Sequence, residues 1–62
     1  MKFTVPDMTC QHCVKTITQA ILAKDAQAQV ACDVPTHTVN VQTLQEDVVI
    51  KQAIIDAGYE IS

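Results

Sequence analysis

The first residues of the chain alternate between apolar and polar side chains. In KFTVP, Phe3 and Val5 alternate with polar neighbours, and Pro6 has no N–H to continue a ladder of hydrogen bonds. The pattern predicts a strand over residues 2–6, followed by a loop over residues 7–9.

From Cys10 or Gln11 onward, the apolar period changes from two residues to that of a helix. Four apolar side chains form a single stripe, and we expect the polar ones between them to face water. The stripe is Val14, Ile17, Ala20 and Ile21, and the polar set is Lys15, Thr18, Gln19 and Lys24. The helix should end near Asp25.

Alternation then returns in two segments separated by a turn. In AQVACDV (28–34), Val30, Cys32 and Val34 fall on one side, so Cys32 is predicted to be a small core residue. PTHT (35–38) is typical of a turn, and VNVQTL (39–44) alternates again. A β-hairpin is the simplest interpretation.

Residues 43–47 should open a second helix, with Thr43 or Gln45 near its N-cap. Its buried stripe is Ile50, Ala53, Ile54 and Ala57. Gly58 is placed as the C′ residue that stops the helix. The last four residues, YEIS (59–62), are predicted to form a short final strand.

The order β-α-β-β-α-β predicts one domain, residues 1–62, of the α/β (α+β) class. Two βα units with right-handed crossovers give a ferredoxin-like sandwich, with a four-stranded antiparallel sheet and both helices on one face. This topology should bring Cys10, Cys13, His37 and Tyr59 to the same end of the sheet.

Composition narrows the function. The formal net charge is −3, and no basic run or aromatic ladder offers a nucleic-acid surface. No apolar stretch approaches the roughly 20 residues of a membrane span, and no signal peptide precedes the first strand. We therefore expect a cytoplasmic protein without membrane insertion or nucleic-acid binding, and a start at Met1 and an end at Ser62 favour a free-standing one.

Cys10 and Cys13 are the candidate metal ligands. Three cysteines cannot all pair, and a reducing compartment keeps thiols free. Two cysteines three apart at a strand-to-helix junction can converge, and the free amides of the helix start favour thiolates. Two thiolates suit a soft ion of low coordination number, above all Cu(I), whereas structural Zn(II) sites usually have four ligands.

Other uses of these residues stay open. A dithiol-disulfide redox pair is expected on a thioredoxin-like framework, which this element order does not fit. His12 should point to solvent, and His37 is expected to be a solvated turn histidine rather than a ligand. The Met8 sulfur is soft enough to bind Cu(I), although a buried anchoring role is favoured.

The segments MTCQHC, VKTI and AGYEI resemble the heavy-metal-associated domain family, and more narrowly its small bacterial copper chaperones. The resemblance implies that Cys10 and Cys13 bind the metal, that Met8 turns inward to pin the loop, and that Tyr59 lies beside the site. Many members have Gly where this chain has Asp7, whose negative charge near the site leaves a divalent ion open. Members that prefer zinc or cadmium often carry an acidic residue at the position of Thr9, so Thr9 favours Cu(I).

The function implied is that of a metallochaperone without enzymatic activity. It would pass Cu(I) by thiolate exchange to a metal-transporting P-type ATPase or its metal-binding domain. The alternatives are a carrier or sensor of Ag(I), Zn(II), Cd(II) or Hg(II). Separately, an open dithiolate site is compatible with a homodimer bridged by the metal.

Overall fold

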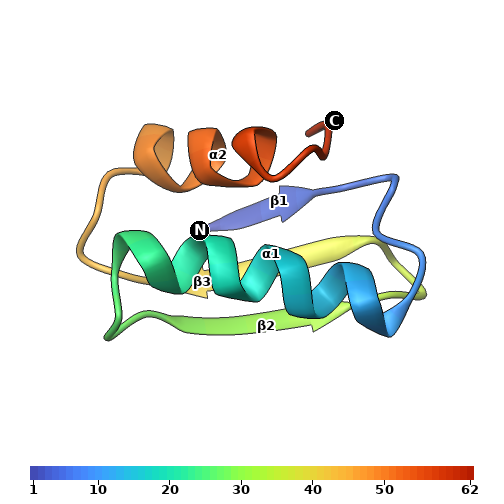
Figure 1. Ribbon diagram of the computed structural model, residues 1–62, viewed down its shortest axis with the longest axis horizontal. Coiled ribbons are helices and arrows are strands. Elements are labelled where there is room, and N and C mark those ends of the chain that lie inside the picture. The colour runs from blue at the N-terminus through green and yellow to red at the C-terminus, as the bar shows by residue number, and fades with distance from the viewer.

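The computed structural model describes residues 1–62 and contains three strands and two helices (Figure 1). The strands form one sheet of order β1-β3-β2, in which both pairs are antiparallel. The elements in chain order are β1 (Lys2–Thr4), α1 (Gln11–Lys24), β2 (Gln29–Asp33), β3 (Thr38–Gln42) and α2 (Asp47–Asp56).

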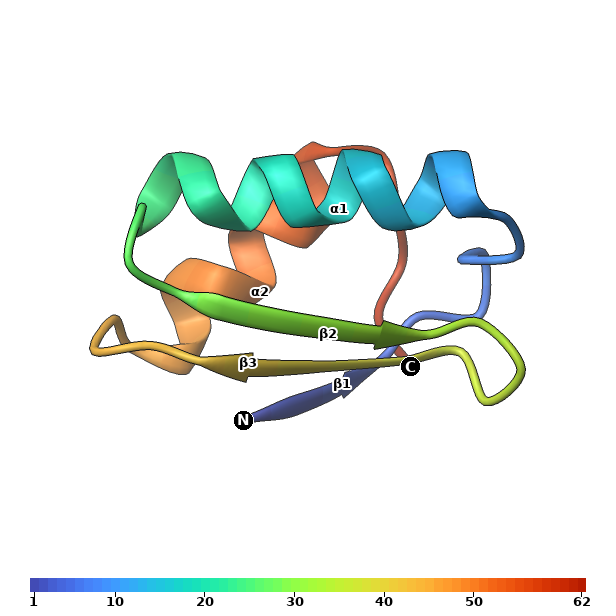
Figure 2. The same ribbon diagram turned by 90° about the horizontal axis from the view of Figure 1, so that it is seen from below.

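Both helices lie on the same face of the sheet, as Figure 2 shows. The register places Phe3 and Cys32 on either side of Val39, and all three pack into the core beneath the helices. Burying one large aliphatic side chain contributes about 1.5–3 kcal/mol. Eight residues make up the buried cluster: Val5, Met8, Ile17, Ile21, Val39, Val41, Ile50 and Ile54.

The apolar stripe of helix α1 faces the core, with Ile17 and Ile21 fully buried and Val14 and Ala20 half-buried. The prediction for Thr18 is wrong, because this residue is half-buried and its hydroxyl lies 3.9 Å from the sulfur of Cys32. Thr18 sits where α1 crosses β2. Cys32 packs against the core as a partly buried residue, as its alternation predicted.

The predicted fourth strand does not form. Residues 59–62 make a single backbone hydrogen bond to the sheet, from Ser62 N–H to Thr4 C=O at 2.9 Å. The neighbouring strand β1 has only three residues, so there is little edge on which a ladder could grow. Tyr59 and Ile61 instead pack their side chains against the core.

Other boundaries also differ from the prediction, and β1 ends at Thr4 rather than at Pro6. Strand β3 ends at Gln42, and Leu44 is fully exposed rather than part of the strand. The N-cap of α2 is Glu46, without a side-chain cap bond. The Thr43 hydroxyl is used elsewhere, since it donates to Asp25 and accepts from Gln45 N–H at 3.1 Å.

Helix α2 ends in a Schellman motif centred on Gly58, which confirms its predicted C′ position. Gly58 has φ +98°, and its N–H donates to Ile55 C=O at 2.9 Å, while Tyr59 N–H donates to Ile54 C=O at 3.3 Å. This reversal carries the chain toward the end of the sheet where α1 begins (Figure 2). Tyr59 is thereby directed to that end.

Replacing Gly58 with alanine should lower the free energy of unfolding by about 1 kcal/mol, because a Cβ disfavours positive φ. The space around an added Cβ is open within 4 Å, so the loss comes from the backbone conformation alone. Urea denaturation of the two proteins measures it. Gly58→Asn, which tolerates this region better, should lose less, and equal stability of Gly58→Ala and the parent would contradict the motif.

Candidate metal centre

The loop that precedes α1 is fixed at Met8. Its side chain is fully buried in the core, as predicted. Its N–H donates to Val5 C=O at 3.0 Å, and its C=O accepts from the His37 ring at 3.1 Å through Nδ1. Thr9 and Cys10, which follow, are exposed. The loop is thus anchored two residues before the first cysteine.

Cys10 and Cys13 converge at the start of α1. Cys10 is the N-cap residue, in extended conformation, and its Sγ accepts from Cys13 N–H at 3.4 Å. The two Sγ atoms are 3.0 Å apart, with one thiol donating to the other sulfur. Cys10 is exposed and Cys13 is half-buried. The spacing of three residues therefore brings the two sulfurs together at an exposed surface, as the sequence predicts.

The pKa of Cys13 is lowered from 9.0 to about 7. The largest cause is the hydrogen bond from the Cys10 thiol, followed by hydrogen bonds from the Tyr59 hydroxyl and the Thr9 amide, while partial burial opposes them. The same interaction with Cys13 raises the pKa of Tyr59. The lowered pKa favours the thiolate form of Cys13, which is the form that binds metal.

The four residues expected at one end of the sheet are found there. Cys10 contacts Cys13, Tyr59 interacts with Cys13, and His37 reaches the carbonyl of Met8. His12 is exposed, as predicted. No group of three or more His, Cys, Asp or Glu side chains gathers into a metal-binding cluster, so the two cysteines stand without a third side chain of these types.

The expectation for His37 is wrong in one respect. His37 is half-buried and bonded to Met8 rather than solvated, with a backbone φ of +57°. Sequence reasoning missed this bond because the partner lies 29 residues away. The only local signal is a histidine at a turn position that demands positive φ, where Gly or Asn is commoner.

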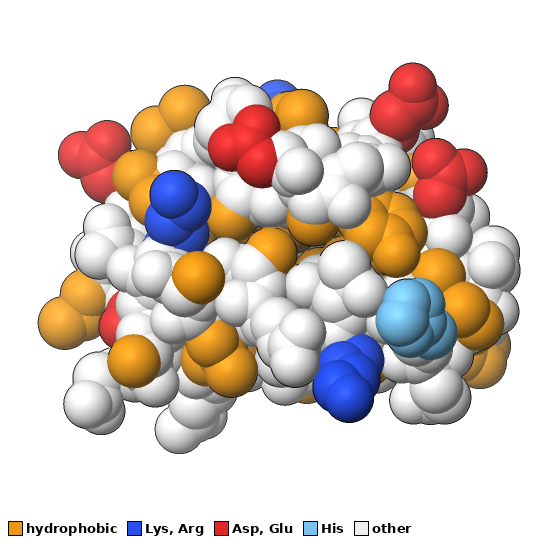
Figure 3. Space-filling view, viewed as in Figure 1, with side chains coloured by type: hydrophobic (Ala, Val, Ile, Leu, Met, Phe, Trp, Pro, Cys, Tyr) orange, Lys and Arg blue, Asp and Glu red, His pale blue; other side chains and the backbone are white.

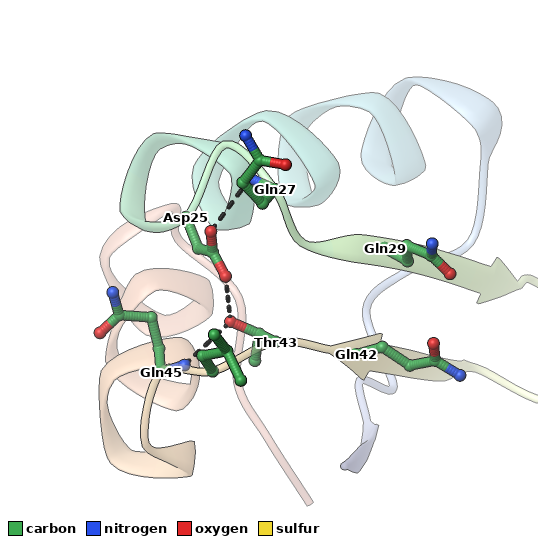
Figure 4. A pocket seen from close by; sticks show the side chains of 7 residues that line it. Asp25, Gln27, Gln29, Gln42, Thr43 and Gln45 are labelled. Carbon is green, nitrogen blue, oxygen red and sulfur yellow. Dashed lines mark hydrogen bonds between the residues drawn. The ribbon is translucent and has the colours of Figure 1, made fainter.

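A hollow lies at the opposite end of α1, where the helix runs into β2 and β3 runs into α2 (Figure 4). It has a volume of about 640 Å³ and is lined mainly by glutamines. Its one carboxylate, Asp25, is bonded to the Thr43 hydroxyl and to Gln27 N–H, which lower its pKa. The carboxylate of Asp25 is therefore already bonded, and the other lining side chains are glutamine amides, one hydroxyl and one leucine.

Charges do not gather strongly over the face seen in Figure 3, where isolated acidic and basic side chains are separated by neutral and apolar atoms. Neither helix is long and apolar enough to cross a membrane. The cysteine pair at the start of α1 is therefore the feature with the clearest chemistry.

Comparisons with known proteins show the family to which the chain belongs. The heavy-metal-associated domain profile matches residues 2–60. The COP-associated protein of Helicobacter felis is 34% identical over 65 residues, covering 98% of both chains. The solved copper chaperone Atx1 from Synechocystis PCC6803, in a trimeric form, superposes with TM-score 0.98 at 32% identity, covering 100% of this chain and 98% of that one. A gold binding protein superposes with TM-score 0.94 at 38% identity, covering 98% and 94%.

Alkylation should distinguish the cysteines in the reduced, metal-free protein. Iodoacetamide should modify Cys13 with a pH midpoint near its pKa of about 7. Cys32 should react slowly, because burial both shields its sulfur and raises its pKa. Mass spectrometry of each cysteine peptide across pH measures both rates.

Two controls accompany this measurement. In urea the two cysteines should react alike, with the midpoint of Cys13 returning toward 9.0. Tyr59→Phe, which removes the hydroxyl, should raise the midpoint of Cys13 in the folded protein. A native midpoint near the unfolded one would contradict the arrangement of hydrogen bonds around Cys13.

Met8 is expected to act as a core anchor. Met8→Ala should lower the free energy of unfolding by about 2–5 kcal/mol, whereas Met8→Leu should cost less than about 1.5 kcal/mol because it conserves volume. Thermal and urea denaturation measure both. Met8→Leu should also keep its affinity for metal, and a large loss of affinity in this folded variant would show instead that the thioether is a ligand.

Proposed function

Because the chain belongs to the heavy-metal-associated domain family, we propose that it is a copper chaperone that carries one Cu(I) ion between Cys10 and Cys13. The observation that carries this proposal is the pair of converging sulfurs, 3.0 Å apart at an open surface, with no third His, Cys, Asp or Glu beside them.

The donor set favours a soft ion with few ligands. Thiolates select Cu(I) among the ions available in a cell, and a structural Zn(II) site would need about four ligands. The solved neighbours named for copper and for gold support a soft metal ion as cargo. Ag(I) is equally soft and would bind in the same way, and Zn(II) is the divalent ion to test against it.

Binding requires the sulfurs to separate. A metal–thiolate bond is about 2.3 Å for zinc, so two sulfurs on opposite sides of one ion of similar size would lie up to about 4.6 Å apart. They are 3.0 Å apart here. Cys13 is held within α1, while Cys10 is exposed at its N-cap after the anchored Met8. The adjustment therefore falls on Thr9 and Cys10.

Release follows from the same openness. A thiolate of a partner can reach the ion and form a third sulfur–metal bond before the bond to Cys10 or Cys13 breaks. No electron is transferred in this exchange, and each departing thiolate is replaced by one from the partner. The partner we propose is a metal-transporting P-type ATPase or its metal-binding domain, and the chain has no catalytic turnover of its own.

The carrier we propose is a single domain, residues 1–62. We place it in the cytoplasm because metal binding needs Cys10 and Cys13 as free thiols, and a reducing compartment keeps them so. An open dithiolate site can also face that of a second copy and share a metal ion with it. A metal-linked homodimer is the competing use of the same sulfurs, and its formation would depend on protein concentration and metal.

Competition for Cu(I) tests the proposal. The fully reduced protein should take one Cu(I) ion per chain from a strong chromogenic Cu(I) chelator under anaerobic conditions. The Cys10→Ser, Cys13→Ser double variant should lose this binding while remaining folded. Cys32→Ser is the control, since it removes the one cysteine outside the pair, and it should bind Cu(I) like the parent.

The same titration with Zn(II) should show much weaker binding. Stronger binding of Zn(II) than Cu(I) would reject copper carriage in favour of a divalent-metal module. Full Cu(I) affinity in both single cysteine variants would reject the assignment of the ligands. Because the two sulfurs are close enough to oxidise to a disulfide, turnover of the metal-free protein in an insulin reductase assay would favour redox function.

A further inference from the structure

Strand β2 forms one edge of the sheet, and its outer side carries unpaired backbone groups. Met1 and Val41 exchange both of their backbone hydrogen bonds, so the odd-numbered residues of β3 bond toward β1 and the even-numbered ones toward β2. The register then leaves the N–H and C=O groups of Val30 and Cys32 pointing away from β3. Figure 1 shows β2 at the border of the molecule, with no segment on its outer side.

The opposite edge of the sheet is better protected. On β1 the groups that point outward belong to Lys2 and Thr4, and the Thr4 C=O already accepts a hydrogen bond from Ser62 N–H. Edge lysines, prolines and covering segments are means by which proteins prevent pairing between edges. Strand β2, with the sequence QVACD, has none of these, and it is longer than β1. Its edge is therefore open to another strand.

The sequence of β2 is complementary to itself in one antiparallel register. Ala31 is the middle residue, so when it lies opposite Ala31 of a second copy, every residue of the strand has a partner. Val30 then faces Cys32 on the helix side of the sheet, and their outward N–H and C=O groups bond to one another. On the other side, the Gln29 amide faces Asp33, whose Oδ1 is free because only Oδ2 accepts a hydrogen bond within the chain.

Helix α1 offers an apolar contact beside the same edge. Thr18 lies over β2, with its hydroxyl 3.9 Å from the sulfur of Cys32. Leu22 follows one turn later on the same side of the helix, and this large apolar side chain is 37% exposed. Pairing of two β2 strands brings the two copies of α1 side by side and antiparallel, which covers Leu22.

We propose that two copies of this chain associate through the edge of β2, in the antiparallel register centred on Ala31, and so form one continuous sheet with all the helices on one face. The inference goes beyond the proposed function and does not rest on it. The turn after β2 lies against the loop before α1, so antiparallel pairing sends the two cysteine pairs to opposite ends of the dimer. Each pair stays open, and the two cannot share a metal ion.

The first test is sedimentation equilibrium of the reduced, metal-free protein, because a five-residue edge should give a weak dimer that depends on concentration. The Cys10→Ser, Cys13→Ser double variant, which can form neither a metal link nor a disulfide through this pair, should dimerise like the parent. Monomers at every concentration up to about 1 mM would overturn the proposal. Dimers that require Cu(I) or the two cysteines would overturn it as well.

The second test compares Ala31→Lys with Asn40→Lys. Both positions are exposed on the outer face of the sheet, and they lie opposite each other in β2 and β3. Ala31→Lys places two like charges opposite each other at the centre of the interface, so the dissociation constant of the dimer should rise about tenfold or more. Asn40→Lys adds the same charge one strand further away and should change it by less than about twofold.

Both lysine variants should keep the melting temperature of the parent, which circular dichroism measures. Equal dissociation constants in these two folded variants would contradict an interface at the edge of β2.

Crosslinking tests the register. In a Cys10→Ser, Cys13→Ser, Cys32→Ala background, Ala31→Cys should form an intermolecular disulfide on mild oxidation, because the two copies of this residue lie about 4.5 Å apart between their Cα atoms. Gln29→Cys is the control, since its counterpart in the second copy lies four residues further along, about 13 Å away. Crosslinking of Gln29→Cys at the rate of Ala31→Cys would overturn the register.

Discussion

The burial of Met8 is the constraint on which the site depends. Its side chain lies in the core, yet Thr9 and Cys10, the next two residues, are exposed. Removing an apolar side chain of this size from water stabilises the fold by about 1.5–3 kcal/mol, and that free energy also fixes the point from which the cysteine loop departs. The cysteine loop is therefore exposed to solvent, although the residue from which it starts is held in the core.

The second contribution comes from the start of α1. A helix N-terminus presents amides without partners inside the helix, and Cys10 occupies its N-cap, where its sulfur accepts from Cys13 N–H. Tyr59 reaches the same pair of cysteines only because Gly58 reverses the chain after α2. Two segments far apart in sequence, the start of α1 and the turn that follows α2, thus supply the surroundings of one pair of thiols.

Much of the fold follows from local patterns. The 3.6-residue period of Ile17 and Ile21 and the alternation of Val39 and Val41 are strong because each of these side chains is fully buried. The prediction from alternation was wrong at Leu44, which is fully exposed because it lies beyond the end of β3 and contacts no part of the core. Local patterns also failed for the last four residues, whose composition suits a strand but whose neighbour β1 offers only a short edge.

The sequence by itself determined the spacing of Cys10 and Cys13, the helix that joins them and the glycine that ends α2, because these depend on interactions within a few residues. The tertiary structure decided which groups surround the sulfurs. The approach of Tyr59 to Cys13 spans most of the chain, and the sequence indicated it only through the predicted topology and the family resemblance. The bond from His37 to Met8 joins residues 29 positions apart, and no pattern in the sequence predicted it, because it depends on how the turn after β2 packs against the loop before α1.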